Sequence, residues 1–119
     1  MSREIRVLIV EDSEEDAFFI ARALQGGAFA VQFERVETAV MMQAALEVGH
    51  WDVIICDYRL PEFGGPEALA LYLKTGLDLP FIVVSGTVGE DLAVEMLKAG
   101  AHDYVMKDRL PRLPESVAK

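Results

Sequence analysis

The chain has little that would suit a secreted, membrane-spanning or repetitive protein. Its 119 residues include a single cysteine, Cys56, which cannot form an internal disulfide and is typical of a reducing cytoplasm. No apolar run approaches the length that a bilayer requires, and no apolar signal-peptide segment follows the N-terminus. There is no internal repeat and no low-complexity tract. We therefore expect a single cytoplasmic globular domain with no membrane segment.

Positive charge is also scarce. The sequence has 11 Lys and Arg residues against 20 Asp and Glu residues, and its net charge is −9. A nucleic-acid-binding face needs clustered cations that replace the counterions of the phosphates. The only basic cluster, Lys107, Arg109 and Arg112, is interrupted by Asp108. This composition argues against nucleic acid as a partner of this chain and favours cationic ligands, although scattered acids also serve solubility alone.

What the sequence does contain is an alternation of strand and helix patterns along nearly its whole length. Apolar runs predict strands at residues 5–10, 30–36, 53–56, 81–84 and 104–106. Capping residues, helical spacing and terminal glycines predict helices after Ser13 and Thr38, from Pro66 onward, at 92–99 and at 115–119. The last helix is too short to be stable alone, so we expect it to be truncated and the chain to be a piece of a longer polypeptide.

The same spacing predicts which helix residues face the core. In the first helix these residues are Ala17, Ile20, Ala21 and Leu24. In the second helix they are Met41, Ala44, Ala45 and Val48, and Met42 is also expected to be core or to fill a gap.

Five strands that alternate with helices predict a single α/β domain over residues 1–119, with a doubly wound parallel sheet. The second strand is interrupted by polar residues, which suits an edge of the sheet. The flavodoxin-like strand order 2-1-3-4-5 fits this edge strand and the apolar first, third and fourth strands. In such sheets, ligands bind beyond the carboxyl ends of the strands.

Polar residues stand directly after four of the predicted strands, which are neighbours in that order. Glu11 and Asp12 follow the first strand, Asp57 the third, Ser85 the fourth and Lys107 the fifth. We therefore expect three carboxylates, one hydroxyl and one ammonium in a single crevice. Close carboxylates repel one another, and Mg²⁺, which prefers oxygen ligands, relieves that repulsion.

Asp57 lies centrally among these groups and is the best candidate for a nucleophile. A carboxylate that attacks phosphorus forms an aspartyl phosphate, and a cation, an ammonium and a hydroxyl can neutralise the transferred oxygens. Each residue alone also has an ordinary structural explanation, such as helix capping for the acid pair or a turn for Ser85. Their joint placement at neighbouring strand ends is what favours a functional site.

Four stretches carry a resemblance to a known family. Residues 10–13, 56–65, 84–86 and 104–107 are similar to the four signatures of CheY-like response-regulator receiver domains, in the same order. The resemblance implies a phosphorylation-activated switch of a two-component system, with a histidine kinase or phosphotransfer protein as donor. It implies an attached or separate output domain and no enzyme activity beyond the chain's own phosphorylation and dephosphorylation. A homodimer remains open.

The resemblance also implies a role for each matching residue at the phosphorylation site. Asp57 is the phospho-acceptor, and Lys107 pairs with the phosphoryl group. The ligands of Mg²⁺ are Asp12, Asp57 and the backbone carbonyl of Arg59, with Glu11 acting through water.

Further residues have roles in switching and tuning. Ser85 matches the switch hydroxyl and Tyr104 the switch aromatic. Arg59 and Thr87, two residues beyond Asp57 and Ser85 respectively, are expected to flank the phosphoryl group and to alter its lifetime.

The sequence departs from the family pattern in three places. The acid pair is Glu-Asp where Asp-Asp is common. Asp108 follows Lys107 where many receivers have a cis-prolyl turn, so we expect a different connection there. Residues 107–113 resemble receivers joined to sensor kinases or PAS-containing proteins more than those joined to DNA-binding domains.

Two other functions remain as alternatives. A pseudo-receiver would act as an interaction module without phosphorylation, but the intact Asp12, Asp57, Ser85 and Lys107 argue against it. An aspartyl-phosphate phosphatase or phosphotransferase of the dehalogenase type would carry Asp-x-Asp after the first strand, and this chain does not.

Overall fold

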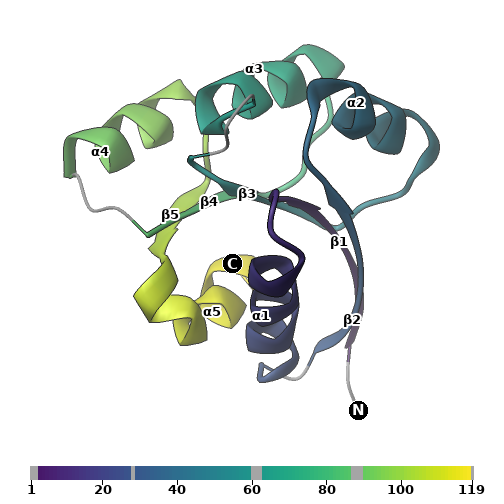
Figure 1. The fold of residues 1–119 in the computed structure, drawn as a ribbon, viewed down its shortest axis with the longest axis vertical. Coiled ribbons are helices and arrows are strands. Elements are labelled where there is room, and N and C mark those ends of the chain that lie inside the picture. The colour runs from purple at the N-terminus through teal and green to yellow at the C-terminus, as the bar shows by residue number, and fades with distance from the viewer. Residues whose placement is uncertain (1–2, 28, 60–62, 87–89, 119) are drawn as a thin grey trace.

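The structure is a computed structural model that describes residues 3–27, 29–59, 63–86 and 90–118. Within these ranges, five strands alternate with helices (Figure 1). The strands are β1 (Arg3–Val10), β2 (Phe29–Val36), β3 (Val53–Asp57), β4 (Phe81–Ser85) and β5 (Asp103–Met106). The helices are α1 (Glu14–Gln25), α2 (Ala39–Val48), α3 (Gly65–Thr75), α4 (Glu90–Ala99), the 3-10 helix η1 (Lys107–Arg112) and α5 (Leu113–Ala118).

The strands form one parallel sheet in the order β2-β1-β3-β4-β5, as the sequence predicts. Helices α2, α3 and α4 cover one face, and α1 and α5 cover the other (Figure 1). Strand β2 pairs only with β1 and forms an edge, which agrees with its polar-interrupted pattern. None of the described helices is long and apolar enough to cross a membrane.

The two faces of the sheet bury two separate apolar layers. In β3, Ile54 and Cys56 belong to the layer under α2, α3 and α4, whereas Val53 and Ile55 belong to the layer under α1 and α5. All four side chains are fully buried, as expected for a central strand covered on both faces. The packing on both sides fixes the strand, and so it fixes the position of the residue at its carboxyl end.

Helix α1 has the core face that its sequence predicts. The side chains of Ala17, Ile20, Ala21 and Leu24 are all buried against the sheet. Ser13 caps the helix, and its Oγ accepts a hydrogen bond of 3.1 Å from the backbone N–H of Asp16.

The structure corrects part of the prediction for the core face of helix α2. Ala45 is buried, but Met41 and Ala44 are exposed and Val48 is 86% exposed. The core side of α2 is made instead by Met42, Ala45 and Leu46. Because all but two of the side chains in this helix are apolar, the spacing alone could not distinguish one stripe from its neighbour.

The connection after β5 differs from a simple loop. Residues 107–112 form the 3-10 helix η1, and α5 begins at Leu113, two residues before the predicted start. No peptide bond in the described segments is cis, so Lys107 is not followed by the cis-prolyl turn of many receivers. Leu113 is fully buried, and Ser116 Oγ donates to Asp103 Oδ2 at 2.5 Å, which ties α5 to β5.

Candidate functional site

The register of the sheet brings the predicted polar residues to one edge. Val10 of β1 is paired with Cys56 of β3, so Glu11 and Asp57 each occupy the next position along these neighbouring strands. Asp57 is the last residue of β3, and Ser85 is the last residue of β4. Lys107 directly follows β5, whose Met106 is paired with Ser85. The sequence-predicted convergence at the carboxyl ends of the strands is therefore present.

The Lys107 ammonium lies among three carboxylates. Its Nζ is 3.0 Å from Asp57 Oδ2, 3.2 Å from Glu11 Oε2 and 2.9 Å from Asp16 Oδ2. Glu11 and Asp57 are buried, whereas Asp16 is partly exposed on the first turn of α1. Such charge-assisted hydrogen bonds are stronger than neutral ones, and here they hold the ammonium against the phospho-acceptor candidate.

The balance of charge in this cluster shifts two pKa values. The pKa of Glu11 is raised to about 8. Burial is the largest cause, contacts with Asp12 and Asp57 act in the same direction, and the charge of Lys107 opposes them. Burial alone would lower the pKa of Lys107, but hydrogen bonds to Asp16 and Asp57 and the charges of Asp57 and Glu11 raise it above its ordinary value. One ammonium therefore does not fully relieve the repulsion among these carboxylates.

Three of the acidic residues are placed to share a cation. Glu11, Asp12 and Asp57 each offer one carboxylate oxygen, and these oxygens lie within 4.8 Å of one another. The donor set consists of hard oxygen atoms, which suits Mg²⁺ and not a softer metal. Asp12 is exposed, so the group is open to solvent on one side. The residues present thus fit the predicted metal, although acidic clusters also occur without one.

The loops beside Asp57 are described in part. The backbone N–H of Arg59 donates to Asp57 Oδ1 at 3.2 Å, and the Arg59 side chain is exposed. Thr87, the second tuning residue predicted from the sequence, lies outside the described residues. The roles of the Arg59 carbonyl in binding metal and of both side chains in tuning remain predictions.

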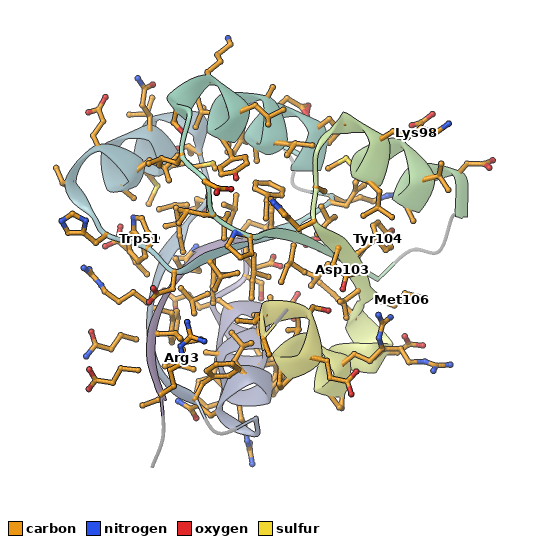
Figure 2. The ribbon with its side chains drawn as sticks, turned by 180° about the vertical axis from the view of Figure 1, so that it is seen from behind. Arg3, Trp51, Lys98, Asp103, Tyr104 and Met106 are labelled. Atoms are coloured by element: carbon orange, nitrogen blue, oxygen red, sulfur yellow. The ribbon has the colours of Figure 1, made fainter. Side chains whose placement is uncertain are left out.

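The two switch residues occupy neighbouring strands. Ser85 is buried at the end of β4. Tyr104 is half-buried on β5 beneath α4, and it packs against the apolar layer that includes Met96 (Figure 2). Their placement is compatible with the predicted roles but does not test them.

Sequence reasoning missed two residues of this region. Asp16 lies three residues after Ser13, where the pattern indicates a capping box, yet its carboxylate reaches Lys107. Arg35, near the end of β2, donates to the backbone carbonyl of Glu11 at 3.2 Å and so braces the turn that carries the acid pair. The signal for Asp16 was its place on the first turn of α1, which the topology puts beside the same sheet edge.

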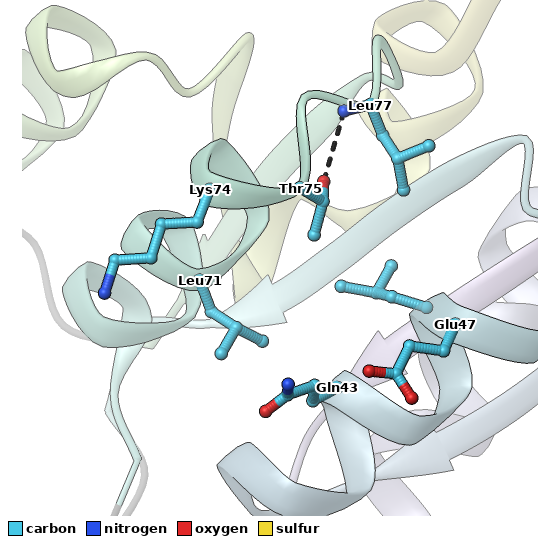
Figure 3. Close-up of a pocket in the computed structure, with 7 residues that line it drawn as sticks. Gln43, Glu47, Leu71, Lys74, Thr75 and Leu77 are labelled. Carbon is cyan, nitrogen blue, oxygen red and sulfur yellow. Dashed lines mark hydrogen bonds between the residues drawn. The ribbon is translucent and has the colours of Figure 1, made fainter.

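A separate hollow lies away from these groups. It occupies about 560 Å³ between α2 and α3 and is lined by leucines with a few polar residues around them (Figure 3). These lining residues are Gln43, Leu46, Glu47, Leu71, Lys74, Thr75 and Leu77. It contains none of the groups that converge at the strand ends, so the candidate site is the acidic edge of the sheet.

Comparison with known proteins identifies the family to which the chain is similar. Residues 7–118 match the family model described as the response regulator receiver domain. The chain is 33% identical over 105 residues to the regulatory protein AtoC of Escherichia coli K12, covering 86% of this chain and 22% of that protein. It is 32% identical over 105 residues to protein-glutamate methylesterase/protein-glutamine glutaminase 1 of Paramagnetospirillum magneticum, covering 87% of this chain and 28% of that protein.

Comparison with solved structures shows that the fold is that of a receiver domain. The signal receiver domain of a LuxO repressor protein from Vibrio parahaemolyticus superposes with a TM-score of 0.82 and 28% identity, covering 97% of this chain and 88% of the other. The chain spans about a quarter of the length of AtoC and of the methylesterase. Because the family model covers nearly all of its residues, the chain belongs to the response regulator receiver domain family.

Proposed function

We propose that this receiver domain is a signalling switch that accepts a phosphoryl group on Asp57 in the presence of Mg²⁺. The observation that carries the proposal is the Lys107 ammonium, 3.0 Å from the Asp57 carboxylate at the carboxyl edge of the sheet. The donor is a histidine kinase or phosphotransfer protein, and the output lies in an attached or separate domain. The domain works in the cytoplasm, as one unit of a longer protein.

In the transfer step, an Asp57 carboxylate oxygen forms a bond to phosphorus. The phosphorus–nitrogen bond of the donor phosphohistidine breaks, and the departing imidazole nitrogen takes up a proton from water. Hydrogen bonds from the Arg59 N–H to Oδ1 and from Lys107 to Oδ2 fix the orientation of the carboxylate before the donor arrives. This pre-orientation lowers the entropic cost of the attack.

Mg²⁺ would be held by Asp12, Asp57 and the Arg59 carbonyl, with Glu11 acting through water. When bound, it neutralises charge on the transferred phosphoryl oxygens. Lys107 supplies a second positive charge from the carboxyl end of β5, at the same edge of the sheet, so cations would flank the reacting centre.

The phosphoryl group then changes the balance of contacts at the strand ends. It carries a charge of about −2 and has three acceptor oxygens. Lys107 donates to one of these oxygens, and the Ser85 hydroxyl moves inward to donate to another. Tyr104 follows into the space beside β4. This movement alters the surface formed by α4, β5 and α5, which the output partner reads.

Intact-mass measurement with acetyl phosphate tests the proposal. With Mg²⁺, the protein should gain the mass of one phosphoryl group, and hydroxylamine should remove it because an acyl phosphate is labile to this nucleophile. EDTA and Asp57→Asn should each abolish the gain. Asp78→Asn, which removes the same charge from an exposed position, should leave it unchanged. An unaltered gain in Asp57→Asn would overturn the assignment.

A further inference from the structure

We propose that Asp16 is a positioning residue that holds the Lys107 ammonium in the unphosphorylated protein and competes with the phosphoryl group for it. The inference rests on the proposed function and concerns a residue outside the acid pair, the phospho-acceptor and the switch residues. Its starting point is the ion pair of 2.9 Å between Asp16 Oδ2 and Lys107 Nζ.

All three donors of the ammonium have partners. A lysine ammonium has three N–H groups, and carboxylate oxygens of Asp16, Asp57 and Glu11 lie 2.9, 3.0 and 3.2 Å from Nζ. A phosphoryl oxygen can therefore gain a hydrogen bond from Lys107 only by taking the place of an existing acceptor. The strength of the Asp16 contact bears directly on how well the site holds that oxygen.

The local structure of α1 directs the Asp16 carboxylate to this contact. In a capping box, the side chain at this position would reach back to the backbone N–H of the capping residue. Here the N–H of Ser13 donates instead to Glu11 Oε1 at 3.2 Å. The Ser13 hydroxyl still anchors the Asp16 N–H, so the backbone of Asp16 is fixed while its carboxylate is available to Lys107.

The three acceptors differ in how easily they can give up the ammonium. Glu11 is almost fully buried, and Asp57 is buried and carries the phosphoryl group itself. The Asp16 side chain is 41% exposed, so water can replace its contact with Lys107. Asp16 is an anion that contacts the Lys107 ammonium and is not one of the three acids that could share a cation. Its charge therefore reduces the positive charge that Lys107 offers to a phosphoryl oxygen.

Beryllofluoride, an anionic phosphoryl mimic, gives a direct test in the full chain with Mg²⁺. Asp16→Asn keeps the shape of the side chain but removes its charge. We expect this variant to bind beryllofluoride roughly three- to tenfold more tightly than the unmodified protein. This fold-change is larger than that expected for an exposed ion pair and smaller than that for a buried hydrogen bond to a charged group, because Asp16 is partly exposed. Glu15→Gln removes the same charge from the same helical turn at an exposed position and should change the affinity less than twofold.

A second readout needs neither metal nor phosphoryl mimic. In the metal-free protein, the ¹⁵N-labelled Lys107 ammonium should give a signal protected from exchange with water. Asp16→Asn should speed that exchange several-fold, Asp16→Glu should restore protection, and Glu15→Gln should not affect it. Equal behaviour of Asp16→Asn and Glu15→Gln in both measurements would overturn the role of Asp16. Failure of the unmodified protein to bind beryllofluoride would instead overturn the proposed function, and with it this inference.

Discussion

At the residue scale, the pKa of Glu11 shows the effect of gathering carboxylates at the buried end of a sheet. Its side chain is almost fully buried and lies beside Asp12 and Asp57, with Lys107 as its partner of opposite charge. Burial, together with contacts with Asp12 and Asp57, raises its pKa from 4.5 to about 8, while the charge of Lys107 acts in the opposite direction. The folded protein therefore binds a proton at Glu11 more tightly than the unfolded chain does.

This shift predicts a specific dependence of stability on pH in the absence of metal. Between pH 5 and 8 the folded state retains the Glu11 proton that the unfolded state has lost, so the free energy of unfolding falls as pH rises. The loss should be on the order of a few kcal/mol, and it should be complete above pH 8. Lys107 titrates above this window because its own pKa is raised.

Thermal unfolding of Glu11→Gln checks this origin. The variant cannot titrate at residue 11, so its midpoint temperature should fall less than that of the unmodified protein between pH 5 and 8. Addition of Mg²⁺ at pH 8 should stabilise the unmodified protein. Identical pH dependence in the two proteins would mean that Glu11 is not the titrating group.

At the element scale, the buried face of a helix could be predicted where apolar residues were distinct from polar ones. The prediction failed where nearly all side chains were apolar. In α1, the four predicted core residues recur at a spacing of three or four positions and are all buried, whereas the apolar Phe18 and Phe19 between them are exposed. In α2, Gln43 and Glu47 are the only polar side chains, and the predicted stripe is displaced by one residue. At the site, residues that directly follow strands were placed correctly, because strand ends fix them.

Residues that depend on a side chain's direction could not be placed from sequence. The Asp16 carboxylate has two possible partners, a helix cap and a distant lysine, and only the three-dimensional arrangement shows that it contacts Lys107. The 3-10 helix after β5 has no clear signal in the sequence, because Pro111 lies inside it and lacks the backbone N–H that a regular helix uses.

The short helix α5 illustrates how tertiary contacts support an element that is too short to be stable alone. Leu113 is fully buried in the layer under α1, and Ser116 is bonded to Asp103 of β5. Leu113→Ala should lower the free energy of unfolding by about 2–5 kcal/mol, as expected for truncation of a buried leucine.

Urea denaturation measures this loss, and Glu115→Ala provides the control on the same helix. Glu115 is exposed, so its replacement should change stability by only about 0.5 kcal/mol. A loss in Leu113→Ala no greater than in the control would show that α5 does not dock through Leu113.

At the scale of the whole molecule, the sheet connects the acidic edge to a distant surface. β3, β4 and β5 are adjacent, and in the proposed mechanism a change at Asp57 reaches Tyr104 through Ser85 on β4, the strand between β3 and β5. A hydrogen bond to a charged group contributes roughly 1.5–3 kcal/mol, whereas a nearly complete population shift needs about 5.5 kcal/mol. In the proposed mechanism, Lys107, Ser85 and the metal would therefore have to act together to move the switch.

The most direct test of the account is the ¹H–¹⁵N NMR spectrum of the full chain before and after acetyl phosphate and Mg²⁺. We predict shifts around Asp57 and also along β5 and α5, including Tyr104. In Ser85→Ala, the shifts around Asp57 should persist and those at Tyr104 should shrink, whereas Asp57→Asn should show neither set. A spectrum of the unmodified protein that does not change with acetyl phosphate, or one that changes equally in Asp57→Asn, would contradict a phosphorylation switch at Asp57.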